Sequence, residues 1–328
     1  MTNQQLNRER MTIMSTDDSK KPIKSRVDFV LVFSVDNANP NGDPGYDNRP
    51  RIDGYTGYGF MTDVCLKRKI RNRIEMMKEL RDGYDIWVRS GMYLRDTVEK
   101  YEGDKKKLCE HFFDIRAFGG VLTGDSEVGE EEGKGTKAKK AKTGRKVKSK
   151  VSQIRGPVSI QYAKSVDRII VEDDQITRIC PTKFDPAKPD KQTEMGRKKR
   201  VPFAVYVAKG SVSARLAEGD KGTGFSVEDL KLLQEAMRTL FHGDESTARP
   251  IGSMIMQKVV FFTHGSKDGD EPVHKTLDRL KVVFKPDKVV DKPEKARDMK
   301  FYPISLDLKG IPSTVIVDDL DVGKMTVS

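Results

Sequence analysis

VDFVLVFSVD, residues 27–36, is the stretch that does most to decide the fold of this sequence. One face of an extended strand there would carry five apolar side chains, those of Val27, Phe29, Leu31, Phe33 and Val35. Val30 and Val32 add apolar side chains to the opposite face. A strand that is apolar on both faces is typical of the buried interior of a sheet. We therefore expect a central strand here, followed by a turn-rich loop at 37–59.

Two amphipathic helices are predicted on the C-terminal side of this strand. The first is expected from about Phe60 to Arg81, where one apolar stripe recurs at helical spacing in Leu66, Ile70, Ile74 and Met77. The second is expected to begin at Ser226, whose spacing from Asp229 resembles a capping box, and to stop at Gly243. Its apolar face comprises Leu230, Leu233, Met237 and Leu240.

Further strands are predicted around these helices, and their order indicates the fold class. Apolar or β-branched stretches favour strands within 154–171, at 201–207 and at 254–263, with weaker signals at 280–285 and 313–317. The order strand, helix, several strands, helix, strand predicts an α+β fold. We expect a ferredoxin-like, RRM-like βαββαβ sheet enlarged by insertions. RNA-recognition modules use the open face and the loops of such sheets.

The composition is typical of a basic protein with reduced cysteines. The 328 residues include 61 Lys and Arg against 50 Asp and Glu, a net charge of +11. This balance fits nucleic-acid binding, although it also fits binding to a membrane surface. The three cysteines, Cys65, Cys109 and Cys180, form no CxxC pair. Residues 1–26 lack the apolar core of a signal peptide, and we expect a mobile tail on a cytoplasmic protein.

A compositional break divides the sequence at 124–150. Residues 125–132 hold five acids, and residues 134–150 hold nine basic residues and no acid. A stretch that is so polar cannot bury enough apolar surface to fold alone. We therefore expect a disordered loop at 124–150.

Carboxylates in the first loop raise the alternative of a metal-dependent nuclease. Asp36, Asp43, Asp47 and Asp53 lie close enough in sequence to hold Mg²⁺ for phosphodiester cleavage. The same residues are also ordinary turn formers, and we favour that explanation. The sequence contains no HExxH, GxxxxGK(S/T) or GxSxG motif. We expect neither a metal nor another cofactor.

Cationic clusters are the more informative signal of function. Four of them occur: NRPR at 48–51, Arg116 before Gly119 and Gly120, Arg155 with Gly156, and MGRKKR at 195–200. Cations neutralise phosphates, and glycines let a backbone approach closely. Any one of these clusters, taken alone, is better explained as an ordinary surface loop. Four of them on a basic chain favour a surface that binds nucleic acid.

Six stretches of the sequence resemble a known family in collinear order. They are FSVDNANPNGDPGYDNRPR, GYGFMTDVCLKRKIRN, DIRAFGGVL, IRGPVSIQ, EMGRKKRVPFAVYVAKG and TARPIGSM. Together they are similar to the backbone subunit of type I-C CRISPR Cascade, the seventh Cas family of the RAMP superfamily. The resemblance runs from about residue 27 to 265, and the tail and the insertion at 124–150 depart from it.

The resemblance implies a right-hand shape that binds a guide RNA, the crRNA. Residues 27–265 would form the palm, with insertions as fingers and a thumb-like arm at about 180–202, and residues 266–328 would be an extension. Copies would polymerise head to tail along the RNA, beside other Cascade subunits. Each copy would hold phosphates, which leaves the bases open for pairing with target DNA.

The expected RNA contacts come from the cationic clusters, the first loop and the first helix. They are Asn41, Asn48, Arg49, Arg51, Lys67, Arg71, Arg116, Arg155, Met195, Arg197, Lys198 and Lys199. No enzymatic activity is expected. The alternative is a RAMP-type metal-dependent endoribonuclease with Asp36 and Asp43 as its acids. A general RNA chaperone is less favoured, because no aromatic RNP-like motif is present.

Overall fold

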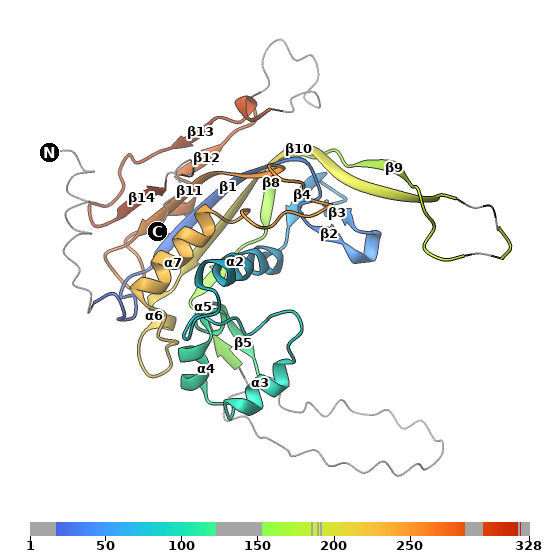
Figure 1. Cartoon of the computed structure of the whole chain (residues 1–328). Coiled ribbons are helices and arrows are strands. Elements are labelled where there is room, and N and C mark those ends of the chain that lie inside the picture. The colour runs from blue at the N-terminus through green and yellow to red at the C-terminus, as the bar shows by residue number, and fades with distance from the viewer. Residues whose placement is uncertain are drawn as a thin grey trace, which may run out of the picture. The chain divides into compact units, whose positions relative to one another are not determined.

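The computed structural model describes residues 18–122, 153–184, 186–188, 190, 192–285, 298–320 and 322 (Figure 1). The first part of the predicted tail and the predicted loop at 124–150 lie outside these residues. The chain has a mixed α/β fold with a large antiparallel sheet. It divides into two compact units. The small unit comprises residues 1–24, 75–159 and 213–230, and the sheet unit comprises residues 25–74, 160–212 and 231–328.

The main sheet has the strand order β14-β11-β1-β10-β8-β4, with β1 between two long neighbours. These strands are β1 Val27–Ala38, β4 Tyr58–Met61, β8 Ala163–Arg168, β10 Glu194–Val212, β11 Met254–Thr263 and β14 Ile316–Leu320. Strand β1 runs antiparallel to both neighbours, with Val27 opposite Val212 of β10 and Thr263 of β11. The central strand predicted from VDFVLVFSVD is thus confirmed.

Apolar side chains cover both faces of β1, as its sequence predicts. On one face, Phe33 stacks on Tyr206 of β10 at 5.5 Å between ring centroids and contacts Phe241 at 5.2 Å. On the other face, Val30 and Val32 belong to a buried cluster that includes Val205, Val260, Phe262, Leu277, Leu280, Phe301, Tyr302 and Val315. Burial of the strand on both sides fixes its register, because a shift of one residue would exchange its two faces.

The two predicted helices are present with shorter bounds. Helix α2 spans Asp63–Lys78, because the residues just before it form strand β4. Helix α7 spans Val227–Arg238 and begins at the predicted capping box. The backbone N–H of Ser226 donates to Asp229 Oδ2 at 2.8 Å, and the N–H of Asp229 donates to Ser226 Oγ at 3.1 Å. No helix of the described ranges is both long and apolar enough to cross a membrane.

Shorter elements complete the described structure. The strands are β2 Gly42–Asp43, β3 Arg49–Pro50, β5 Gly119–Val121, β6 Gln153–Arg155, β7 Val158–Ile160, β9 Glu172–Arg178, β12 Leu280–Val282 and β13 Ile304–Leu306. The helices are α3 Leu94–Lys100, α4 Lys105–His111, α5 Phe113–Phe118, α6 Ala214–Ala217 and α8 Val273–Leu277, with 3₁₀ turns η1 Pro44–Tyr46 and η3 Met299–Phe301. The weak strand signals at 280–285 and 313–317 correspond to β12 and β14.

The small unit has its own apolar core and a buried ion pair. The core comprises Trp87, Val98, Leu108, Cys109, Phe112, Ile115, Leu122 and Ile154. Beside the start of α7, Arg116 donates from Nε and Nη2 to Asp229, at 2.8 and 2.7 Å. Burial disfavours the charged guanidinium, but the hydrogen bonds and charge of Asp229 outweigh burial and raise the pKa of Arg116. Asp229 thus caps α7 and neutralises a buried cation at once.

We predict that Asp229→Ala lowers the free energy of unfolding by about 3–5 kcal/mol, because it leaves Arg116 buried without a counter-charge. Glu99→Ala is the control, since Glu99 forms an exposed i,i+4 pair with Arg95. That change should lower stability by less than about 0.5 kcal/mol. Urea unfolding of both variants measures the difference. Equal losses in the two variants would contradict the structural role assigned to the buried pair.

Candidate nucleic-acid interface

Three segments of the sheet unit carry most of the predicted RNA contacts. They are the loop between β1 and β4, helix α2, and the hairpin formed by β9 and the first part of β10 (Figure 1). In this hairpin, Glu194–Arg200 of β10 pair with Glu172–Arg178 of β9. We call this hairpin the arm. It includes the C-terminal part of the predicted thumb at 180–202, but β10 begins at Glu194, seven residues before the predicted strand at 201–207.

Acids on β9 face the cations of the arm. Arg197 Nη1 lies 3.7 Å from Asp173 Oδ2, and 68% of its side chain is exposed. Lys198 lies opposite Asp174 in the strand register. Arg200 donates to Asp174 and also pairs with a second β9 acid, Glu172. Met195 is 66% exposed. A polyanion that binds the arm must therefore compete with these internal carboxylates.

An ion pair joins the arm to the first loop. Lys199 Nζ lies 2.5 Å from Asp47 Oδ2, and only 13% of the lysine side chain is exposed. The hydrogen bond and charge of Lys199 lower the pKa of Asp47. Two cationic clusters that are about 150 residues apart in sequence are thereby brought together. The sequence gives no local signal of this contact.

The first loop is held by its own polar side chains. Asn41 Oδ1 accepts hydrogen bonds from the backbone N–H and hydroxyl of Thr62 at the start of α2, at 3.0 and 3.1 Å. Arg51 Nη1 donates to Asp43 Oδ2 at 2.8 Å. Asn48 has a positive φ of 53°, and it is exposed together with Arg49. Asn41 and Arg51 thus order the loop, whereas Asn48 and Arg49 lie at its surface.

The loop acids form turns and ion pairs. Asp43 and Asp53 each accept the backbone N–H of the residue two positions later at 3.0 Å. Asp36, which the sequence placed in the loop, lies near the end of β1 and accepts a hydrogen bond from the side chain of its neighbour Asn37 at 2.6 Å. Among the residues that the structure describes, no group of three or more His, Cys, Asp or Glu side chains is arranged to hold a metal ion.

Helix α2 contributes a buried cation that sequence reasoning missed. The predicted contacts Lys67 and Arg71 are half-buried, and Lys67 pairs with Asp63 at 2.9 Å. Lys69 is buried and pairs with Asp244, which also binds Arg249 of the TARPIGSM stretch at 2.9 Å. Burial lowers the pKa of Lys69. Lys69 lies beside the apolar stripe of the helix, and this position in the sequence was the signal that it would be buried.

The predicted contacts Arg116 and Arg155 belong to the small unit. Arg155 is exposed on β6, but Arg116 is buried against Asp229, so it serves the fold of this unit and we leave it out of the interface. The glycines beside them serve close packing within the unit. A Cβ at Gly119 would lie 2.2 Å from the carbonyl oxygen of Ile154, and one at Gly156 would lie 2.3 Å from the carbonyl carbon of Phe118.

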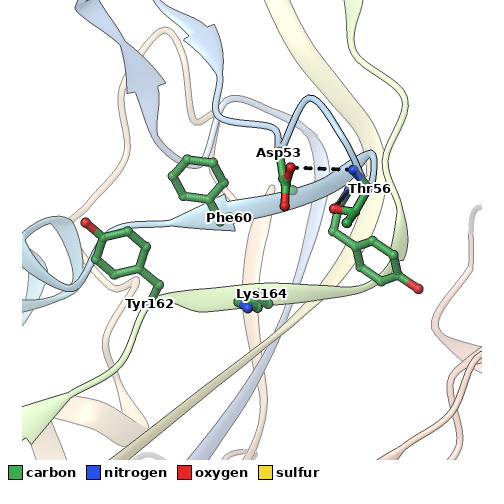
Figure 2. A pocket seen from close by; sticks show the side chains of 7 residues that line it. Asp53, Thr56, Phe60, Tyr162 and Lys164 are labelled. Atoms are coloured by element: carbon green, nitrogen blue, oxygen red, sulfur yellow. Dashed lines mark hydrogen bonds between the residues drawn. The ribbon is translucent and has the colours of Figure 1, made fainter.

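A surface pocket of about 620 Å³ lies beside β4 and β8 in the sheet unit (Figure 2). It is lined by Asp53, Thr56, Tyr58, Gly59, Phe60, Tyr162 and Lys164. The rings of Phe60 and Tyr162 stack at 5.9 Å between centroids, with 10° between their planes. Sequence reasoning missed this pocket, although the alternation of aromatic residues at 58–60 was a signal.

Comparisons with known proteins agree on one family. The family model described as CRISPR-associated protein Cas7 matches residues 25–307. A CRISPR-associated protein Cas7 of Haloferax volcanii is 27% identical over 177 residues, which cover 48% of this chain and 48% of that protein. The chain thus spans about half the length of the curated relative that it matches.

Two solved structures are similar to the chain at low identity. One is described as a CRISPR RNA-guided surveillance complex, pre-nicking, with a TM-score of 0.42, 12% identity and coverage of 76% of this chain and 80% of that chain. The other is described as a CRISPR RNA-guided surveillance complex, with a TM-score of 0.38, 15% identity and coverage of 76% and 71%.

We predict that Asp47→Asn strengthens binding of single-stranded RNA by about two- to fivefold, because it removes the negative charge that pairs with Lys199 and leaves only neutral hydrogen-bond acceptors at residue 47. Asp278→Asn is the matched control, since it removes the same charge and frees Lys209, which pairs with Asp278 at 2.6 Å. Lys209 lies on β10 roughly 33 Å from Lys199. Fluorescence anisotropy with labelled RNA measures both variants. An equal gain in both would indicate an effect of net charge alone.

Proposed function

Because the chain belongs to the Cas7 family of CRISPR-associated proteins, we propose that it binds a guide RNA as a backbone subunit of a Cascade-type surveillance complex. The observation that carries this proposal is the family match over residues 25–307. The structure supports it with an interface in which the first loop and the arm adjoin through the pair of Lys199 with Asp47. The net charge of +11 favours a polyanionic ligand.

The succession of elements supports a ferredoxin-like palm. It runs β1, α2, β8, β10, α7 and β11, and the strands lie in the order β11-β1-β10-β8, each antiparallel to its neighbour. This is the βαββαβ order of that fold. We infer that the palm spans 27–265, that the arm is its thumb and that residues 266–328 are an extension.

The proposed mode of binding uses phosphates and leaves the bases free. Arg49 and Asn48 on the loop, Arg155 on the small unit, Lys67 and Arg71 on α2, and Met195, Arg197, Lys198 and Lys199 on the arm are the contacts that we retain. Contacts to phosphates carry no sequence information, which suits a protein that holds any guide. The free bases then pair with target DNA.

A repeating ligand also determines how copies of the chain associate. Identical contacts along an RNA require a head-to-tail arrangement, because a closed two-fold interface would end growth. We propose that copies assemble in this way in the cytoplasm, together with other Cascade subunits.

The test of this function is whether the purified protein carries a discrete RNA of repeat–spacer length, and whether the arm is needed for it. Replacing Arg197, Lys198 and Lys199 by Ala should leave the chain folded, because all three lie outside the buried part of β10. It should shorten RNA-dependent oligomers in sizing chromatography. The salt slope of binding should fall by less than about three units, because acids already face these cations.

Replacing Lys100, Lys106 and Lys107 by Ala is the matched control, since these exposed lysines lie in the small unit and two of them also face acids. It should leave the assemblies unchanged. Full-length assemblies with wild-type salt sensitivity in the arm variant would show that the arm does not bind the RNA.

We also propose that the chain is not a nuclease, because the loop carboxylates are engaged in turns and ion pairs. Incubation of the assembled complex with Mg²⁺ and complementary RNA should leave the RNA intact on a denaturing gel. Cleavage that disappears in Asp36→Ala or Asp43→Ala would instead support a metal-dependent endoribonuclease.

A further inference from the structure

One face of strands β4 and β8 alternates aromatic and cationic side chains. Tyr58 of β4 lies opposite Arg168 of β8, and Phe60 lies opposite Lys164, with a register shift between the two pairs. Tyr162 directly precedes β8 and stacks on Phe60. Residues that face each other in an antiparallel pair share one face, and Tyr58 and Phe60 are two positions apart on β4, so these side chains lie on one side of the strands.

The aromatic side chains of this surface are not part of the core. Tyr162 is 51% exposed and Tyr58 is 39% exposed. Neighbours that alternate with them, Met61 and Ala163, are fully buried. Gly59 lies between the aromatic residues of β4, and a Cβ there would approach the buried Tyr206 hydroxyl to 2.5 Å. The core thus lies on the opposite side of the two strands, and the rings of Tyr58 and Tyr162 face outward.

Polar groups complete the pocket that these rings line. Figure 2 shows the Phe60 and Tyr162 rings toward one end and Thr56 toward the other, with Asp53 and Lys164 between them. The backbone N–H groups of Tyr55 and Thr56 both donate to Asp53 Oδ1. The Thr56 side chain also hydrogen-bonds Asp53. A carboxylate has about four acceptor sites on its two oxygens, so Asp53 can still accept a hydrogen bond from a ligand. Lys164 is exposed and can bind an anion.

We propose that this pocket binds one unpaired nucleobase of a single-stranded nucleic acid, which stacks on Tyr162 while Lys164 contacts an adjoining phosphate. The proposal rests on the proposed function and extends it from phosphates to a base. The volume of about 620 Å³ lies within the range of small-ligand sites. Stacking accepts any base, because every base has a π-face. The Asp53 carboxylate favours bases with an amino group, because such a base can donate to it.

Lys164 distinguishes a nucleotide from other ligands that stack on aromatic rings. A sugar or an apolar peptide would use Tyr162 but would gain little from Lys164. A nucleotide uses both kinds of side chain, because its base stacks and its phosphate carries charge. The stacked pair of Phe60 and Tyr162 also stabilises β4 against β8, so the experiment must separate this role from binding.

The experiment compares short labelled RNAs with and without bases, using full-length protein freed of nucleic acid. Tyr162→Leu should weaken binding of the intact RNA by about 5- to 100-fold, and Tyr162→Phe should keep wild-type affinity. On an abasic RNA of the same length, wild type and Tyr162→Leu should bind equally. Tyr93→Leu is the control, because Tyr93 is a 76% exposed aromatic of the small unit. The affinity for a DNA of the same sequence shows whether the pocket prefers RNA, as in the guide, or DNA, as in the target.

The outcomes separate the two proposals. If wild type binds neither RNA nor DNA, the proposed function fails. If wild type binds but Tyr162→Leu is unchanged, or loses equally on the abasic RNA, the pocket does not bind a base. A second measurement, on wild type alone, tests the proposal even if Tyr162→Leu fails to fold. Photocrosslinking of wild type to RNA that contains 5-iodocytidine, whose base carries an amino group, should label Tyr58, Phe60 or Tyr162, and crosslinks confined to other residues would overturn the proposal.

Discussion

The pairing of β1 with β10 on one side and β11 on the other is the constraint on which the sheet unit depends. Both faces of β1 are buried, so its register is fixed by packing as well as by hydrogen bonds. The first loop leaves the end of β1, and the arm continues β10 beyond the last paired residues, Ala38 and Val201. One strand pair therefore places both cationic segments, which explains how Asp47 comes to bind Lys199.

The arm combines many cations with little uncompensated charge. Each cation from Arg197 to Arg200 has an acid of β9 or of the first loop nearby or opposite it. These pairs order the side chains before any ligand binds, and they also compete with the ligand. A phosphate is therefore favoured only where it matches the geometry of these ordered side chains. Its placement relative to them then contributes more to binding than the net charge of the arm.

Local patterns predicted the elements, and long-range contacts determined the roles of single residues. Alternation of apolar residues predicted β1, and the spacing of Ser226 and Asp229 predicted the start of α7. The start of α2 was predicted too early, because apolar Phe60 and Met61 fit a strand as well as a helix. Arg116 beside glycines has the same local sequence character as a phosphate-binding arginine. Its burial depends on Asp229, 113 residues away, which no local pattern reveals. The pocket likewise joins Phe60 to Tyr162 across a large sequence separation.

Strand β10 is continuous over 19 residues, from the exposed arm to the buried sheet. Its side chains alternate without interruption, so the faces of the arm are set by the same alternation as the faces of the core. Insertion of one residue at the junction near Arg200 would turn Met195 and Arg197 to the other side of the hairpin. A change of length at this junction would therefore keep the faces of the arm only if an even number of residues were added or removed, matched on β9. Each such step of two residues would change the reach of the arm by roughly 7 Å.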